Sequence, residues 1–152
     1  MVELPRGMYP GKIDEKGRLK LPAPFQQYVA ALREKKLFVT SLDKCTAQIY
    51  PIQVWRGNEK FFETYRDDVD MAADVAFTAN DLGAECEMDM QGRILFSTDL
   101  RRKLDIEDKP VRLFAYKGHI EVLSEETYEK RKSQAARITT ADVRKLEAAG
   151  LN

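Results

Sequence analysis

An aspartate stands four residues before an arginine at two places in the chain. The first pair is Asp14 and Arg18, and the second is Asp89 and Arg93. The aspartate carboxylate can accept backbone N–H bonds across a tight turn, and it can hold the guanidinium by a bidentate ion pair. A guanidinium held in this way is directed at a phosphate or at the edge of a guanine. Each pair therefore predicts a polyanion contact, with an ion pair that only stabilises the turn as the alternative interpretation.

The two Asp–Arg pairs belong to an internal repeat. Residues 13–21 (IDEKGRLKL) align with residues 88–96 (MDMQGRILF) at an offset of 75, with Asp, Gly and Arg coincident and apolar positions matched. The likeness continues at an offset of 73, where residues 46–51 align with residues 119–124 and Trp55 aligns with Tyr128. Two matching blocks in the same order indicate a duplication, so each pair lies at the same place in one of two similar modules.

The sequence of each module predicts two short strands that form a hairpin, with the Asp–Arg pair at its turn. Gly17 and Gly92 precede the arginines and supply the positive φ that a tight hairpin needs. Prolines, N-cap residues and apolar spacing predict the other elements. In the first module we expect helices from Pro22 and Pro51, the first with an apolar face of Phe25, Tyr28, Val29 and Leu32, and strands over 9–13, 18–21, 37–40 and 47–50. In the second we expect helices capped by Ser97 and Ser124 and strands over 85–89, 93–96, 111–116 and 120–123.

These elements predict an α+β fold that is rich in β structure. We expect residues 6–55 to form the first module and residues 83–128 to form the second. Residues 56–82 are expected to be a helix followed by an acidic connector, part helix and part loop. Residues 129–152 are expected to be a C-terminal helical tail, whose last short helix is capped by the segment Thr139–Asp142.

Lysines surround the first arginine but not the second. Residues 12 to 20 of even number share one face if the hairpin pairs regularly, and the cations on that face are Lys12, Lys16, Arg18 and Lys20. Such a face suits polyanion binding, because each cation can neutralise a phosphate. The matching positions of the second module hold Glu87, Gln91, Arg93 and Leu95. We therefore expect the first hairpin to contribute more of the affinity.

The charges are segregated along the chain, although their sum is zero. Residues 1–36 contain eight Lys or Arg and four Asp or Glu, residues 37–92 contain four and eleven, and residues 93–152 contain thirteen and ten. A neutral protein with this distribution can still present a basic face to a nucleic acid. The sequence has neither a secretory signal at its N-terminus nor an apolar run of the roughly 18 residues that a membrane helix needs. We therefore expect a cytoplasmic protein without a membrane partner.

The sequence does not favour an enzyme or a metal protein. It has no phosphate loop and no serine elbow, and its single histidine, His119, follows Gly118 in a turn and is expected to be a solvated loop residue. Cys45 and Cys86 are far apart and outside any C-x-x-C pair, so we expect two free thiols, no zinc site and no cofactor. A small-molecule substrate is not expected either.

At these residues the sequence resembles the MraZ proteins, bacterial transcriptional regulators with two AbrB-like (SpoVT-AbrB) modules in one chain. The likeness covers roughly residues 6–132, and its matching pieces are residues 9–22 (YPGKIDEKGRLKLP), residues 89–95 (DMQGRIL), Tyr50-Pro51 with Trp55, and residues 117–122 (KGHIEV). The sequence departs from the family at Ser97, which replaces the proline usual after the second motif.

The resemblance implies two strand–helix–strand modules packed about a pseudo-twofold axis, like an AbrB-type dimer fused into one chain. It also implies a homo-oligomeric ring, an octamer or larger, on double-stranded DNA in the nucleoid. The ring would repress transcription from direct repeats in the promoter of the division and cell-wall gene cluster. By the same resemblance Arg18 and Arg93, supported by Asp14 and Asp89, make the DNA contact. An AbrB-like antitoxin, or an assembly module without sequence-specific DNA binding, is the alternative.

Overall fold

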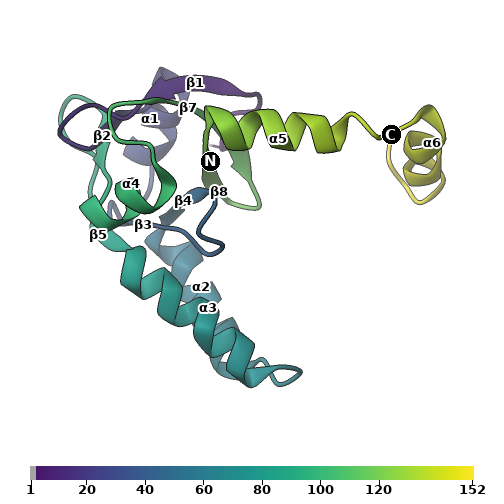
Figure 1. Cartoon of the computed structure of the whole chain (residues 1–152), viewed down its shortest axis with the longest axis horizontal. Helices are drawn as coiled ribbons and strands as arrows, with labels where there is room; N and C mark the ends of the chain where they lie inside the picture. Colours follow the sequence, from purple (N-terminus) through teal and green to yellow (C-terminus); the bar gives the residue numbers. More distant parts are fainter. Residues whose placement is uncertain (1–2) are drawn as a thin grey trace.

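The computed structural model describes residues 3–152 of the chain, which form two antiparallel sheets and six helices (Figure 1). The larger sheet has the strand order β1-β7-β8-β4-β3-β5 and the smaller is a ribbon of β2 and β6. The strands are β1 (Tyr9–Lys12), β2 (Arg18–Lys20), β3 (Leu37–Thr40), β4 (Ala47–Pro51), β5 (Ala84–Cys86), β6 (Arg93–Leu95), β7 (Pro110–Tyr116) and β8 (His119–Ser124). The helices are α1 (Ala23–Ala30), α2 (Ile52–Thr64), α3 (Val69–Leu82), α4 (Thr98–Leu104), α5 (Glu125–Ala135) and α6 (Thr140–Ala148).

The two halves of the chain exchange strands, so the expected hairpins are wrong. β1 pairs with β7 and β2 pairs with β6, and only an isolated bridge between Ile13 and Leu19 joins the two strands of the expected first hairpin. The ribbon is centred on the pair Leu19–Ile94, which the 75-residue repeat also aligns. Two equivalent strands that pair antiparallel are related by a twofold axis. The fold is thus the expected α+β arrangement of two modules packed as a fused dimer, whereas the boundaries at residues 55, 82 and 128 stay a prediction.

One core joins the ribbon to the sheet. Leu19 and Ile94 are fully buried on the inner side of the ribbon, where they pack with Phe25 of α1, Leu100 of α4 and the inner face of the large sheet. Burial of side chains of this size removes a large apolar area from water, and each Å² of that area stabilises the fold by roughly 25 cal/mol. The ribbon is therefore held against the body by its odd-numbered residue in β2 and its even-numbered residue in β6, and the alternate side chains face outward.

Local signals in the sequence start the helices where expected. Pro22 and Pro51 precede α1 and α2. The Ser97 hydroxyl accepts a hydrogen bond from the backbone N–H of Leu100, and that of Ser124 accepts one from Thr127. Thr139 and Asp142 form a reciprocal capping box at the start of α6. In the expected connector, α3 follows a short loop and the Asp68 carboxylate caps it.

His119 is buried in β8, so its expected place in a solvated loop is wrong. The turn before it is confined to Lys117 and Gly118, and β8 starts at His119 itself. Only 7% of the residue is exposed, and its ring packs against that of Tyr50 with the centroids 4.5 Å apart and the planes tilted by 35°. Within residues 3–152 its Nε2 has no hydrogen-bond partner, although Oε1 of Glu121 lies 3.5 Å away.

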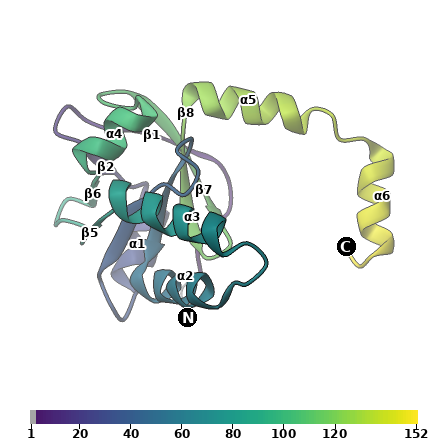
Figure 2. The same cartoon turned by 60° about the horizontal axis from the view of Figure 1, so that its bottom comes forward.

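Two helical projections leave the body of the molecule. α2 and α3 form a hairpin that extends downward in Figure 1, and α5 leads away from the end of β8 to α6, which stands apart from the rest in both views (Figures 1 and 2). α2 and α3 cover the outer face of β3 and β4 through a second apolar cluster of Phe38, Tyr50, Ile52, Trp55 and Ala79. None of the helices in the described part of the chain is long and apolar enough to cross a membrane.

Candidate nucleic-acid interface

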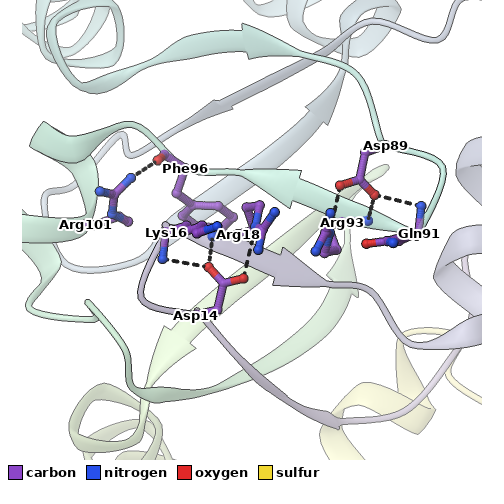
Figure 3. A network of polar contacts seen from close by, with 8 residues as sticks. All are labelled: Asp14, Lys16, Arg18, Asp89, Gln91, Arg93, Phe96 and Arg101. Atoms are coloured by element: carbon purple, nitrogen blue, oxygen red, sulfur yellow. Dashed lines mark hydrogen bonds and ion pairs between the residues drawn. The ribbon is translucent and has the colours of Figure 1, made fainter.

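The first Asp–Arg pair closes a turn at the start of β2. Oδ1 of Asp14 accepts hydrogen bonds from the backbone N–H groups of Lys16 at 2.9 Å and Arg18 at 2.8 Å. Oδ2 accepts one from Nε of Arg18 at 3.0 Å (Figure 3). The backbone of Asp14 also bonds to Gly17 and Arg18. One carboxylate therefore determines both the shape of the turn and the direction of the arginine side chain.

The second pair repeats this geometry. Oδ1 of Asp89 accepts from the backbone N–H groups of Gln91 and Arg93, each at 2.9 Å, and Oδ2 accepts from Nε of Arg93 at 2.7 Å. The expected bidentate ion pair is wrong in both turns, because only Oδ2 binds the guanidinium while Oδ1 accepts from the backbone. In the described residues neither Arg18 nor Arg93 forms a hydrogen bond through Nη1 or Nη2. Both guanidinium ends are thus free to bind a ligand.

The hydrogen bonds in the turns favour the ionised aspartates. The backbone N–H of Arg18 is the main cause that holds the pKa of Asp14 below its usual value, and desolvation opposes it weakly enough that the net shift is downward. The backbone N–H of Arg93 lowers the pKa of Asp89 in the same way. The two carboxylates are therefore negative at neutral pH and keep the arginine side chains in place.

Each turn needs glycine for two reasons. Gly17 has a φ of 86° and Gly92 a φ of 78°, a region that other residues rarely adopt. A Cβ atom on Gly17 would also overlap the Arg101 guanidinium, and one on Gly92 would overlap the Gln26 amide. The turn of each module is therefore packed against a helix of the other module, α4 on Gly17 and α1 on Gly92.

Gln26 and Arg101 are site residues that the sequence interpretation missed. Nη1 of Arg101 donates to the Phe96 carbonyl oxygen at 2.5 Å, and Nε2 of Gln26 donates to that of Leu21 at 2.7 Å. The two positions are 75 residues apart, so the repeat itself could have identified them as equivalent. Their carbonyl acceptors lie at the ends of the ribbon strands, and Arg101 adds a cation beside the first turn (Figure 3).

The ribbon register collects cations from both modules on one face. Arg18 lies opposite Leu95, and Lys20 lies opposite Arg93. Cross-strand partners share a face and alternate residues share a face, so all four side chains point away from the core. The side chains of Arg18 and Arg93 are 28% and 26% exposed. In Figure 3 the two arginines lie between the two aspartates.

The remaining expected site residues lie farther from this face. Lys16 is exposed in the first turn, at one end of the ribbon. Lys12 is exposed on β1 in the large sheet, and its Nζ lies 3.3 Å from a carboxylate oxygen of Asp108. Lys12, Lys16 and Lys20 are all exposed, as the alternation along the strands predicts. They do not share one surface, however, because Lys12 belongs to the large sheet and Lys20 to the ribbon. The interface that the geometry supports therefore consists of Arg18, Lys20 and Arg93, with Lys16 and Arg101 at one end.

The dimensions of the ribbon suit a duplex. Two paired strands lie about 4.8 Å apart, and the major groove of B-DNA, about 12 Å wide, admits a two-stranded ribbon. Arginine ends that point outward from such a ribbon can donate to phosphates or to O6 and N7 of guanine.

Among residues 3–152 no group of three or more metal-binding side chains is present.

Comparison with known proteins gives one consistent result. A protein-family model described as "MraZ protein, putative antitoxin-like" matches residues 83–148. The chain is 32% identical over 146 residues to a transcriptional regulator MraZ from Acidobacterium capsulatum, with 96% of this chain and 99% of that protein covered. It is 35% identical over 125 residues to one from Thermoanaerobacter sp., with 81% and 82% covered. A third, from Koribacter versatilis, is 28% identical over 147 residues, with 96% and 99% covered.

Proposed function

This chain belongs to the MraZ family, and we propose that it is a transcriptional regulator that binds double-stranded DNA with the outer face of the β2–β6 ribbon. One observation carries the proposal: two separate Asp–Arg turns direct their arginines onto a single cationic ribbon. A salt bridge that only stabilised one turn would have no need of this convergence.

Three kinds of residue have different roles in the proposed DNA contact. Arg18 and Arg93 offer Nη1 and Nη2 to base edges or phosphates, because Nε is already bound to an aspartate. Lys20 and Lys16 are point charges that neutralise phosphates. Asp14 and Asp89 are positioning residues, since they act on DNA only through the arginines. A guanidinium that is already oriented loses less conformational entropy when it binds.

We further assign the protein a repressor's role on direct repeats in the promoter of the division and cell-wall gene cluster, with a place in the nucleoid. One ribbon spans only three residues in each strand and contacts a short stretch of duplex. A site of several direct repeats therefore requires several ribbons held together, and a ring of eight or more copies would supply them. Such an assembly raises the avidity for repeated sites without a new kind of contact.

Footprinting on the DNA upstream of the protein's own gene tests the proposal. We expect protected direct repeats, and we expect the folded Arg18→Ala variant to lose them. Unchanged protection by that variant would exclude the ribbon as the contact surface. Titration at two salt concentrations adds a second measurement, because phosphate contacts make the affinity fall steeply with salt.

An antitoxin-like function is the competing candidate, because the description of the matching family model names it. In this candidate function the chain binds a protein partner and does not discriminate between DNA sequences. The same titrations separate the candidates. Equal affinity for operator and random DNA, unchanged by Arg18→Ala and Arg93→Ala, would favour the competing candidate. No catalytic step enters either function.

A further inference from the structure

A cavity of about 380 Å³ lies on the outer face of the large sheet, between α2 and the strands β4 and β8. Gln48 lies opposite Glu121 in the sheet, and these two residues form the floor of the cavity together with Tyr50 and His119. Apolar side chains of α2 form a wall, and Tyr116 at the end of β7 lies at the rim. We name this site the β8 cavity. A mostly apolar hollow of roughly 300–1,000 Å³ with a few polar groups is typical of a small-ligand site.

The floor contains a buried polar atom that the described protein does not bind. The side chain of His119 is only 9% exposed, and within residues 3–152 its Nε2 has no hydrogen-bond partner. Burial of an unpaired polar atom costs free energy, because the atom loses its hydrogen bond to water and gains none from the protein. A ligand that hydrogen-bonds to Nε2 would remove this cost.

Glu121 offers a second polar atom beside it. Oε2 of Glu121 accepts from Nε2 of Gln48 at 2.8 Å. Gln48 is itself held, because its Oε1 accepts from the backbone N–H of Leu42 at 3.0 Å. The carboxylate is thus fixed with its Oε1 3.5 Å from Nε2 of His119. A single hydroxyl group can bridge these two atoms, since its oxygen accepts from Nε2–H and its hydrogen is donated to Oε1.

Aromatic rings surround the two polar atoms. The centroid of the Tyr50 ring lies 4.5 Å from that of His119, and the centroid of the Tyr116 ring lies 6.2 Å from it. Phe61 and Phe62 of α2 also line the cavity, and Phe61 is 56% exposed. Aromatic rings pack favourably on one another in offset or edge-to-face arrangements. These surroundings therefore favour an aromatic ring as the body of the ligand.

The charged groups of the cavity disfavour a charged ligand. The Glu121 carboxylate on the floor repels an anion. A cation would be attracted by Glu121, but Lys117 lines the same cavity and its Nζ lies 5.1 Å from the centroid of the Tyr116 ring. Lys117 therefore already makes the cation–π contact that this ring can offer, and it repels a second cation. An uncharged ligand meets neither repulsion.

We propose that the β8 cavity binds a small, uncharged hydroxyaromatic compound, that is, a phenol. Its hydroxyl accepts a hydrogen bond from Nε2–H of His119 and donates one to Oε1 of Glu121, and its ring packs against Tyr50 and the phenylalanines of α2. The compound is bound without a chemical step. This inference is independent of the proposed DNA contact, because the residues that line the cavity are not those of the β2–β6 ribbon.

Water and a primary ammonium group are the competing occupants of the floor. A water molecule can form the same two hydrogen bonds, but it gains no apolar contact with the aromatic walls. An ammonium group can donate to Oε1 of Glu121 and to an Nε2 of His119 that carries no proton. Lys117 opposes it by like charge. Binding of ligands that differ in one group distinguishes these occupants.

Isothermal titration calorimetry of the full chain with 4-methylphenol at pH 7.5 tests the proposal. We expect one site per chain, with a dissociation constant on the order of 1 mM or below. The methyl ether of the same compound, 4-methylanisole, has no proton to donate to Glu121 and is expected to bind at least about tenfold more weakly. Benzylammonium and 4-methylbenzoate, which add a positive and a negative charge, are also expected to bind more weakly.

Variants of the floor locate the bound hydroxyl. His119→Phe keeps an aromatic ring and removes Nε2, and Glu121→Gln replaces a carboxylate oxygen, so each is expected to weaken 4-methylphenol binding at least about tenfold. His119→Gln can place an amide N–H near the position of Nε2 and is expected to retain most of the affinity. Glu85→Gln, outside the cavity, is the matched control and is expected to bind as wild type does. Urea denaturation verifies that each variant is folded.

Each contrary outcome overturns the proposal. No binding of 4-methylphenol at millimolar concentration would mean that water alone occupies the floor. Equal binding of 4-methylanisole would mean an apolar hollow without a hydroxyl site, and tighter binding of benzylammonium would mean an ammonium site. Wild-type affinity in folded His119→Phe or Glu121→Gln would place the ligand elsewhere. Failure of the proposed DNA function would appear separately, as unchanged DNA affinity of Arg18→Ala.

Discussion

The two Asp–Arg turns have the same hydrogen bonds but different electrostatic surroundings. Both aspartates accept two backbone N–H bonds and one Nε bond, with matching distances. Around the first turn lie Lys16 and Arg101, whereas their counterparts around the second are Gln91 and Gln26. The two modules thus share the aspartates that shape the turns, but they differ in the charged residues around those turns. The backbone requirement is strict, and the charge requirement can be met anywhere on the shared face.

The ribbon register reduces the difference between the two arginines. Leu95 of the second module stands where the first has Lys20, which on the sequence alone leaves Arg93 isolated. The strand exchange places Lys20 opposite Arg93 and Leu95 opposite Arg18. Arg93 therefore has a lysine neighbour across the ribbon. The imbalance that remains is at the turns, where one end of the ribbon has two more cations than the other.

Removal of the arginines is expected to have the largest effect. Arg18→Ala should weaken operator binding by about 1–3 kcal/mol for each engaged ribbon, and by more in an assembly that uses several copies. Arg93→Ala should weaken total binding less, because its end of the ribbon contributes fewer phosphate contacts, but it should reduce discrimination between operator and random DNA. Titration of both variants on both DNAs at two salt concentrations measures the difference. Equal losses everywhere would show that the two turns act symmetrically.

Substitution of Gly17 and Gly92 compares how strictly the two turns require their backbone conformation. Gly17→Ala and Gly92→Ala each force a side chain into a positive-φ position and against a helix of the other module. We expect each variant to lower the free energy of unfolding by about 1–3 kcal/mol, the usual cost of such strain. Urea denaturation of the two variants measures it. Gly57→Ala, in open space on α2, is the control and should not destabilise the protein.

The salt dependence of DNA binding is expected to differ between the two turns. Lys16→Ala should weaken binding about equally on all sequences and reduce the slope of log K against log salt by about one unit. Gln91→Lys places a cation at the matching position of the second turn and should raise the slope by a similar amount. An unchanged slope in either variant would mean that these turn positions do not reach phosphates.

Acid pH is expected to have the smallest effect and to act on both turns alike. The pKa values of Asp14 and Asp89 are lowered in the folded state, so their stabilising contribution is complete above the ordinary value of about 3.9. It is lost as the pH falls through the folded-state pKa. The double variant Asp14→Asn with Asp89→Asn should therefore be less stable than wild type at pH 7, and the difference should shrink below about pH 4. Urea midpoints at several pH values test this, and a constant difference would contradict it.

Features that depend on near neighbours in the chain could be predicted from the amino-acid sequence. The Asp–Gly–Arg turns, the helix starts at Pro22, Ser97 and Ser124, and the capping box at Thr139 all involve groups within a few residues of each other. Hydrogen bonds and φ limits at this range are set by residue type and spacing. The repeat showed in addition that two equivalent sites exist.

Contacts between residues that are distant in the chain depend on how the whole chain packs. A three-residue strand such as β2 can pair with many antiparallel partners, and its choice of β6 over β1 follows from the joint burial of Leu19 and Ile94 in one core. That choice put Lys20 beside Arg93 and separated Lys12 from the ribbon. The same packing placed Gln26 and Arg101 over the glycines of the opposite module, and α2 packed beside Tyr50 buried His119 in β8. Long-range burial, which no local pattern encodes, selected these contacts.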